Sequence, residues 1–589
     1  MAGRRLLLVL RQYGRERLEA AGELEAVRRR HALWWAQFLE SRRDALACAG
    51  AALRKAEGVL DDLQGAWEWI SAHGEPAQID GFLDGLWRIY RLTGRYQEAV
   101  FAIERTAGVC APPTLTAKWV RWQADALYQM GEVGQGEVRV RHSLLLLSEG
   151  VPTGRLGWTA KLAGEIARHA ILLSPRRAAD PAEGEAAAQA AHAYYMLGQI
   201  AYLQGRPQVL VACGFAMANR AVRCGDGLAV ARAFGALGMV MGCMRLRTLA
   251  RRYCDTALAE ARRTPGSLAE AFACQVVGIY CCGIAQFERG LDLLDRAARL
   301  FAQHHMPRYR TECEALRAKV LHFTGRAFRD AFEEHRRYGA VAEAVGDPHA
   351  RHWSLVGQAE TQLRLGEVGL EQVIGWLEQA RGIAADVGDG ERLRLWGVLA
   401  LALARAGDAS AALAAVEEAL SLEQAIAIPP FYVMEGYAGT AEALLALGED
   451  NHARTRALAR LPRALRHMHR FALRYPLAAP RSLVFEAAHS RRAGRAARAR
   501  RLAERAAALA RRHGMLYEQA LALAEQGLAQ AEIGSTRAAD LLHEAERLCR
   551  QIGARHEGER LAVLLGSAPP SARTASPWTP LAAGSRMVD

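Results

Sequence analysis

The stretch that decides the fold is Leu395-Trp-Gly-Val-Leu-Ala-Leu-Ala-Leu-Ala-Arg-Ala-Gly407-Asp-Ala-Ser-Ala-Ala-Leu-Ala-Ala-Val416. Before Gly407, offsets of three, four and seven place four side chains on one helical face: Trp396, Leu399, Ala400 and Leu403. After it, the same spacing relates Ala412, Val416 and Ala419. The stretch therefore predicts two antiparallel helices joined by a glycine turn, with alanines where the backbones cross.

This pattern recurs along the chain, each time with a glycine between an apolar helix and an alanine-rich helix: Gly94, Gly131, Gly205, Gly325, Gly366, Gly407, Gly448 and Gly494. The last steps up to Gly448 are 41 residues each, and Gly205 to Gly325 is three steps of 40, with middle turns near Arg245 and Ala285. Such a period is the signature of a repeat array, and the unit resembles the tetratricopeptide pattern. We predict an all-α fold, an α-solenoid (superhelix) of tetratricopeptide-like helix pairs with a 40–41-residue period.

Breaks in this pattern suggest five segments. Residues 1–70 are helical without a clear unit, and 71–173 form a first repeat block. Residues 174–190, which contain Pro175 and Pro181, are expected to be an irregular loop that divides the array. The main solenoid follows over 191–566. Residues 567–589, rich in Pro, Ser and Ala, are expected to be a disordered tail.

Composition limits the class of protein. The chain is 51% hydrophobic and 24% charged, so it can bury a large core. No apolar run approaches the 18 residues of a membrane span, and the five-residue run near the start is too short for a signal peptide. The sequence predicts a cytoplasmic protein with no membrane partner.

No motif for catalysis is present. None of the four lysines (Lys55, Lys118, Lys161 and Lys319) follows a glycine, so the phosphate-binding Walker loop is missing. A His-Arg-Asp kinase loop, a nucleophile–base pair and a metalloprotease spacing are missing too. The eleven cysteines have no C-x2-C spacing, which favours reduced thiols packed in the core. We therefore predict no catalytic residue, no cofactor and no metal.

A solenoid offers a continuous inner surface, because each unit adds one inward-facing helix. The favoured function is a non-enzymatic scaffold or sensor arm that binds a partner protein or a small inducer in its inner groove. The tetratricopeptide register predicts these lining residues: His192, Tyr195, Gln199, Tyr202, Glu360, Glu435 and Glu442. The sequence does not indicate the oligomeric state.

Charge is concentrated in one region. Residues 451–520 hold 17 arginines against three acidic residues. The candidate basic patch comprises Arg491, Arg492, Arg495, Arg498, Arg500 and Arg501. The favoured interpretation is a solvated outer surface, since arginine stems pack well over alanine-rich helices. The alternative is a regulator that contacts nucleic acid weakly through this block.

The chain also resembles the C-terminal sensor arm of bacterial STAND-type signalling ATPases. These include regulators like the maltose-regulon activator and ATPases linked to a nucleotide cyclase or a Ser/Thr kinase. The resembling phrases are Leu10-Arg-Gln-Tyr-Gly-Arg-Glu-Arg-Leu18, Asp62-Leu-Gln-Gly-Ala-Trp-Glu-Trp69 and Tyr194-Tyr-Met-Leu-Gly-Gln-Ile-Ala-Tyr202. The resemblance implies a role in bacterial signal transduction or transcriptional regulation. Because the Walker loop is missing, the alternatives are a free-standing arm and a truncated portion of such an ATPase, cyclase or kinase.

Overall fold

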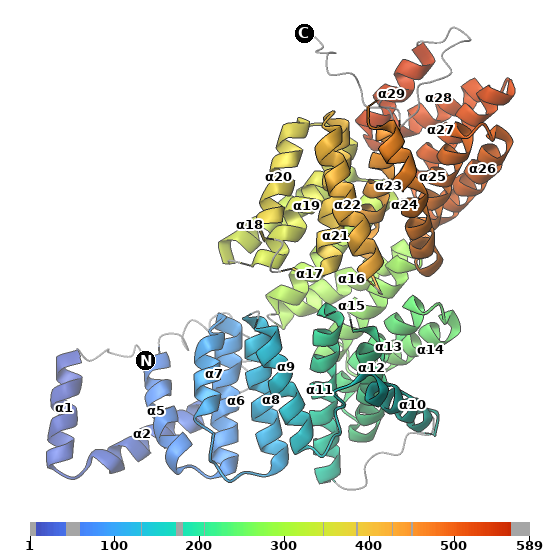
Figure 1. Cartoon of the computed structure of the whole chain (residues 1–589). Helices are drawn as coiled ribbons and strands as arrows, with labels where there is room; N and C mark the ends of the chain where they lie inside the picture. The colour runs from blue at the N-terminus through green and yellow to red at the C-terminus, as the bar shows by residue number, and fades with distance from the viewer. Residues whose placement is uncertain are drawn as a thin grey trace.

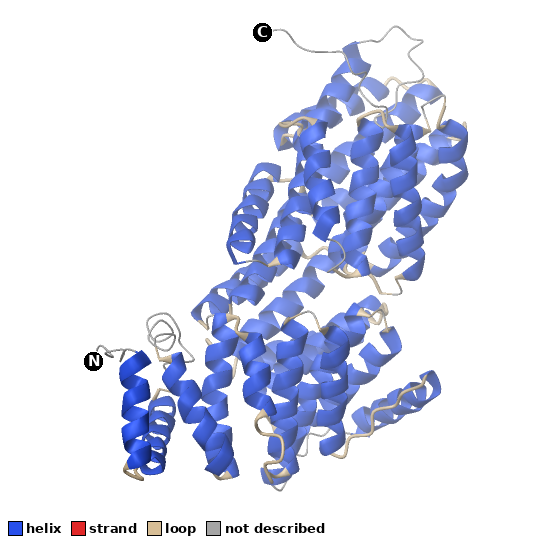
Figure 2. Cartoon of the chain, turned by 60° about the vertical axis from the view of Figure 1, so that its left-hand side comes forward, coloured by secondary structure: helices blue, strands red, loops and turns tan. Residues whose placement is uncertain are grey.

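The computed structural model describes residues 8–42, 59–171 and 181–566, apart from residues 131, 205, 305, 346, 384–386, 427 and 449–451. Every regular element in these ranges is a helix (Figure 2). The predicted all-α solenoid is confirmed. The tail expected over 567–589 lies outside the described residues, as do Gly131 and Gly205.

The helices of the first half are α1 (Leu8–Ala20), α2 (Leu24–Ser41), α5 (Leu60–His73), α6 (Pro76–Thr93), α7 (Tyr96–Glu104), α8 (Pro113–Gln129), α9 (Val133–Leu146), α10 (Arg155–Ile171), α11 (Pro181–Leu203), α12 (Pro207–Cys224), α13 (Gly227–Cys243), α14 (Arg247–Ala261), α15 (Leu268–Gly283) and α16 (Phe287–Gln303).

Those of the second half are α17 (Pro307–Thr324), α18 (Phe328–Val345), α19 (Pro348–Leu365), α20 (Leu370–Ile383), α21 (Asp389–Arg405), α22 (Ala409–Ala425), α23 (Met434–Leu447), α24 (Arg454–Arg474), α25 (Ala479–Arg492), α26 (Ala496–His513), α27 (Leu516–Ile533), α28 (Ala538–Ile552) and α29 (Arg555–Gly566), with short 3-10 turns η2 (Phe431–Val433) and η3 (Pro476–Ala478).

Successive helices pack as pairs, from α6 with α7 to α27 with α28, and α10 is an extra helix that packs on α12. The first helix of each pair also packs on the first helix of the next pair, so α8, α11, α13, α15 and their successors form a continuous inner layer. The second helices cover that layer on the outside (Figure 1). Burial follows this order: all 14 residues of α23 are buried, whereas α24 buries one stripe.

The turns within the pairs explain the glycine period. Gly94, Gly325 and Gly407 have φ of 72°, 63° and 85°, in the left-handed region that ends a helix and favours glycine. Arg245 and Ala285, where the period predicts a turn without glycine, adopt the same conformation with φ of 65° and 62°. The 40-residue step is therefore confirmed even where its glycine has been replaced.

Two expected boundaries are wrong. Residue 70 lies inside α5, and Trp35 from the N-terminal segment shares one core with Leu83 and Trp119 of the first repeats. Residues 181–190 are the first turns of α11, because Pro181 is its first residue, where a missing N–H costs nothing. Residues 172–180 lie outside the described residues. A single core joins Trp158 before this segment to Tyr194 after it, so the array is not divided there.

The array bends instead further along. In Figure 1, α1–α14 form an elongated lower part and α17–α29 a thicker upper part, and α15 and α16 lie between them. The upper part closes on itself, because α17 packs on α27 and α19 packs on α29. The inner helices α21 and α23 touch backbone to backbone: a Cβ on Gly397 would lie 2.0 Å from the carbonyl oxygen of Gly436. We name residues 307–566 the closed part and residues 76–303 the open part.

Candidate binding surface

The inner face of the array is marked by residues at one repeat position. His192, Arg232, Phe272 and Glu312 are each 40 residues apart and lie on α11, α13, α15 and α17. Steps of 41 then lead to Trp353, Arg394 and Glu435 on α19, α21 and α23. This spacing identifies Arg232 and Glu312 as further inner-face residues. They were not among the lining residues predicted from the tetratricopeptide register.

In the open part, and at its junction with α17, the inner face is polar and, apart from the buried Gln275, partly exposed. We name this set the inner polar surface: Arg121, Gln189, His192, Tyr195, Gln199, Arg232, Gln275, Tyr309 and Glu312. Hydrogen bonds link it across the helices: Arg121 donates to Gln189 at 3.3 Å, Gln199 to the Tyr195 hydroxyl at 2.8 Å and Gln275 to Glu312 at 3.1 Å. Five first helices thus contribute to one surface.

Two arginines of this surface have no carboxylate partner. No ion pair within 4 Å joins Arg121 or Arg232 to an acidic side chain among the described residues, and the Nε atom of each is buried without a hydrogen bond. The Arg232 guanidinium lies 3.8 Å from the ring centre of Phe272 and 5.0 Å from that of Tyr195. Burial, together with Arg232 and Arg91, lowers the pKa of Arg121 to about 10, which leaves it charged at neutral pH.

Three of the four groove residues predicted on α11 belong to this surface. His192 lies 3.8 Å from the Asp226 carboxylate, but burial and the charges of Arg121 and Arg232 lower its pKa to about 3, so the imidazole is neutral at pH 7. Tyr195 and Gln199 lie on the same helical face. The side chain of Tyr202 lies outside the described residues. That these residues bind a ligand remains a prediction.

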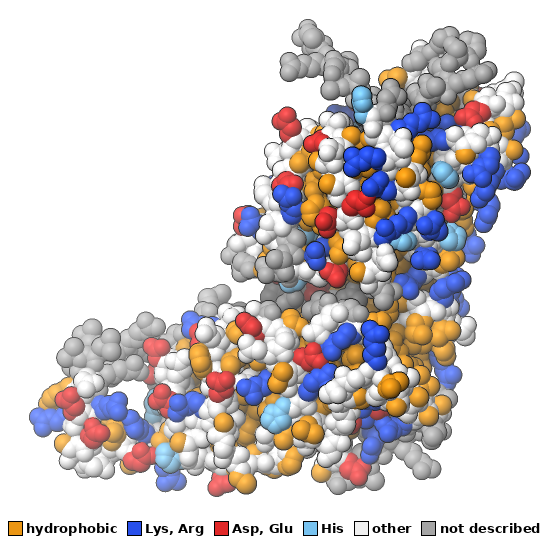
Figure 3. Space-filling model, viewed as in Figure 1, with side chains coloured by type: hydrophobic (Ala, Val, Ile, Leu, Met, Phe, Trp, Pro, Cys, Tyr) orange, Lys and Arg blue, Asp and Glu red, His pale blue; other side chains and the backbone are white. Residues whose placement is uncertain are grey.

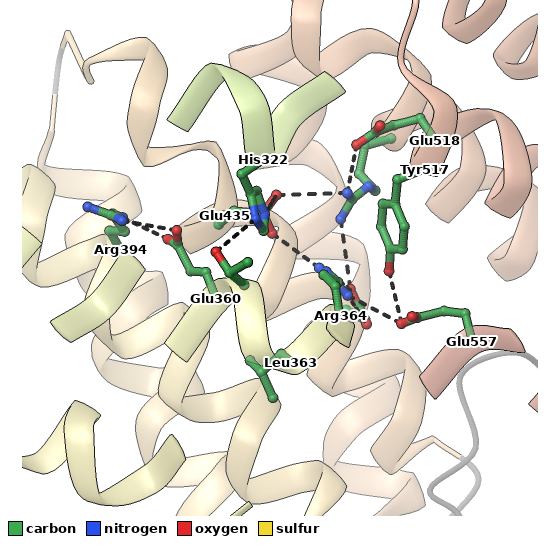
Figure 4. Close-up of polar contacts among 12 residues, drawn as sticks. His322, Glu360, Leu363, Arg364, Arg394, Glu435, Tyr517, Glu518 and Glu557 are labelled. Carbon is green, nitrogen blue, oxygen red and sulfur yellow. Dashed lines mark hydrogen bonds and ion pairs between the residues drawn. The ribbon is translucent and has the colours of Figure 1, made fainter. Parts of the chain in front are cut away.

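The structure corrects the prediction that three glutamates line the same open groove. Glu360, Glu435 and Glu442 do face the superhelix axis, but they are 2–3% exposed and no open groove reaches them. The closed part winds so tightly that inner-face side chains meet one another (Figure 4). Glu360 accepts from Arg394 at 2.7 and 3.0 Å and also from Lys319.

Arg364 joins three glutamates from two further helices, α23 and α29. Its guanidinium lies 3.0 Å from Glu442, 3.2 Å from Glu435 and 3.5 Å from Glu557 (Figure 4). Burial alone would raise the pKa of Glu442, but Arg364 and Arg405 lower it to about 2. The charges at this depth are paired with one another, so none is left for a ligand, and removing one partner would leave the other desolvated and unpaired.

Tyr517 extends this cluster between two arginines. The guanidiniums of Arg364 and Arg481 lie 4.7 and 4.8 Å from its ring centre, and its hydroxyl donates to Glu557 at 2.9 Å. We name these residues together the axial ion-pair cluster: Lys319, Glu360, Arg364, Arg394, Arg405, Glu435, Glu442, Arg481, Tyr517, Glu518 and Glu557.

The candidate basic patch is divided by the structure. The prediction that Arg491 belongs to an exposed patch is wrong, because Arg491 is buried and pairs with Glu525 at 3.0 Å and Glu532 at 3.2 Å. Arg492 is partly buried and donates to the Leu445 carbonyl at 2.6 Å, and Arg500 pairs with Glu504 at 2.8 Å. The other three, Arg495, Arg498 and Arg501, are exposed.

The described cysteines are free thiols, and most are buried, as predicted. Cys281 and Cys282 are in the core, where burial raises the pKa of both. In the described ranges, no three His, Cys, Asp or Glu side chains are arranged to hold a metal ion. None of the described helices combines the length and apolar character needed to cross a bilayer.

The helix pairs and the inner face define the class: a helical-repeat α-solenoid of tetratricopeptide-like units. Among solved structures, the APC/C hetero-tetramer Cut9–Hcn1 is similar with 11% sequence identity and a TM-score of 0.38, over 83% of this chain and 91% of that chain. Yeast Tom70 is similar with 13% identity and a TM-score of 0.32, over 85% of this chain and 100% of that chain. No protein-family model and no curated protein sequence matches the chain.

Proposed function

We propose that the chain is a non-enzymatic scaffold that binds an extended acidic segment of a partner protein across the inner polar surface. The observation that carries this proposal is the pair Arg121 and Arg232, two charged arginines without a carboxylate partner. The inner-face charges of the closed part are paired with one another, whereas these two are left over. A partly buried charge without a partner costs stability, and a carboxylate from a ligand would reduce that cost.

The rest of the surface suits a peptide. Gln189 and Gln199 offer both donors and acceptors to a backbone, and the rings of Tyr195 and Tyr309 offer apolar contact with a polar tip. The helices α8 to α17 supply these groups side by side, so an extended chain could run across successive units.

The proposed setting is bacterial signal transduction or transcriptional regulation in the cytoplasm. It rests on the resemblance of the sequence to the sensor arms of signalling ATPases.

Site-specific photocrosslinking in the source cells tests the function. A photoreactive amino acid in place of Gln199 should give a reproducible adduct with one partner protein. Adding Arg121→Gln and Arg232→Gln should reduce that adduct at least tenfold. The same photoreactive residue in place of Leu249, which is exposed on α14, is the matched control and should give no such adduct. Adducts of equal yield from both positions, or an adduct that the two arginine substitutions leave unchanged, would contradict the proposal.

A further inference from the structure

A second charged surface lies on the outer side of the closed part, away from the inner polar surface. A cleft of about 340 Å³ opens between α24, α25 and α26. Arg466 and Arg470 line it from α24, Arg495 and Arg498 line it from the start of α26, and His469 and His489 complete its walls. We name it the outer basic cleft. Figure 3 shows Lys and Arg side chains gathered on the right of the upper part, where these helices lie.

The four arginines of the outer basic cleft are exposed and are not neutralised. None of them makes an ion pair within 4 Å among the described residues, and two of the three acidic residues of 451–520 are engaged elsewhere. Glu518 is buried with Arg481, and Glu504 pairs with Arg500. Glu486 lines the cleft itself and lies 3.3 Å from His469, so one carboxylate faces four arginines. The positive charge of the cleft therefore faces solvent.

Two further features favour an anion here. Helix α26 begins at the cleft with no side-chain cap, so the partial positive charge of its first turn adds to the arginines. Burial and the charges of Arg495, Arg492 and Arg498 lower the pKa of His489, which reflects the positive potential at this site. Spacing of four residues on α24 and three on α26 places each arginine pair on one helical face, so two rows flank the cleft.

We propose that the outer basic cleft binds the phosphate backbone of a single-stranded nucleic acid. The positive charge extends along the two helices beyond the cleft. Further exposed arginines without ion pairs lie on α24 and α26: Arg454, Arg456, Arg501, Arg505, Arg511 and Arg512. Helix α24 is about 30 Å long at 1.5 Å per residue, which suits a polymer with repeated phosphates better than one small anion. Arginine forks recognise phosphate oxygens in a bidentate manner.

The cleft contains no aromatic side chain other than its two histidines. Base stacking on Phe, Tyr or Trp is what usually adds affinity for single strands. We therefore expect binding that is sequence-independent and strongly dependent on salt. A membrane is the less suited occupant, because a lipid surface would need a flat face and this site is hollow.

Fluorescence anisotropy with a labelled 20-nucleotide oligo(dT) tests the proposal. Four contacted phosphates predict a log–log salt slope of about −3 for a single strand, so raising NaCl fourfold from 50 mM should weaken binding by roughly 50-fold. In the variant Arg466→Gln, Arg470→Gln, Arg495→Gln, Arg498→Gln, the slope should become less negative by about three, so that little salt dependence remains. Oligo(dA) of the same length should bind within about threefold of oligo(dT).

The matched control removes the same charge from another outer helix. The variant Arg247→Gln, Arg251→Gln, Arg252→Gln, Arg262→Gln changes four exposed arginines on and just after α14 and should bind oligo(dT) like the wild type. All eight positions are exposed, and circular dichroism checks that each variant folds. Equal losses in the two variants, no detectable binding at 50 mM NaCl, or sedimentation with phosphatidylserine vesicles in place of oligo(dT) binding would each overturn the proposal.

Discussion

The axial ion-pair cluster makes a quantitative prediction about Arg364. Its side chain is 1% exposed and contacts the carboxylates of Glu442, Glu435 and Glu557. Removing one partner of a buried ion pair costs about 3–5 kcal/mol, because the remaining charge is left desolvated. The substitution Arg364→Met keeps most of the volume and removes the charge, so it isolates this cost.

The neighbours of Arg364 place the expected cost toward the lower end of that range. Glu442 and Glu557 keep Arg405 at 2.7 and 2.8 Å, and Glu435 keeps Arg481 at 3.8 Å. No carboxylate is therefore left wholly alone. Losing the contact with the Tyr517 ring adds about 1 kcal/mol. We expect Arg364→Met to lower the free energy of unfolding of the closed part by about 3–4 kcal/mol.

Urea unfolding followed by circular dichroism and hydrogen exchange measures this loss. With an m-value of about 3 kcal/mol per molar urea, the midpoint of the closed part should fall by about 1 M. Hydrogen exchange should rise across α19–α29 and little in α6–α9. The control Arg392→Met breaks an exposed pair with Asp389 and should cost less than about 1 kcal/mol. If the two variants shifted the midpoint equally, the cluster would not hold the closed part together.

Two more predictions follow from the cluster and the turns. Glu360 and Glu442 have folded pKa values of about 2, below the roughly 4.3 of an unfolded glutamate. Each therefore contributes roughly 3 kcal/mol to the free energy of unfolding, which is present above about pH 4.5 and is lost as the pH falls toward 2. The urea midpoint of the closed part should fall over that window, and Glu442→Gln should flatten the fall; an unchanged midpoint at pH 3 would contradict this. Arg245 has φ of 65°, so Arg245→Gly should relieve about 1 kcal/mol of backbone strain and raise the thermal midpoint. The control Arg251→Gly lies inside α14 and should lower the midpoint. If both substitutions destabilised the protein, the assignment of strain to Arg245 would be refuted.

The fold could be predicted from the sequence because the 40-residue period is kept even in units whose turn has no glycine. Arg245 and Ala285 lack the glycine, yet the helices on either side keep their length and force the same left-handed turn. Pro181 was interpreted as part of a loop, because a proline can end one helix or begin another, and only the packing of α11 decides between them.

Three of the nine residues of the inner polar surface could be predicted from the sequence, and the depth of the groove could not, for a physical reason. The register tells which side chains face the axis, and His192, Tyr195 and Gln199 follow it. It does not tell how tightly the superhelix winds, which depends on close contacts such as that of Gly397 with Gly436. Glu360 was therefore placed in an open groove, although it is buried. Arg491 was placed on the surface because its partner Glu525 is 34 residues away.

The closure of α29 onto α19 has a consequence for how this chain can vary. In an open helical-repeat array each unit contacts only its neighbours, so a whole unit can be gained or lost with little disturbance elsewhere. In the closed part, Glu557 must return to Arg405, 152 residues earlier. One unit more or fewer would carry α29 past its partner helix. We therefore expect duplications and deletions of whole units among related chains to fall in the open part, with the number of units after α17 held constant.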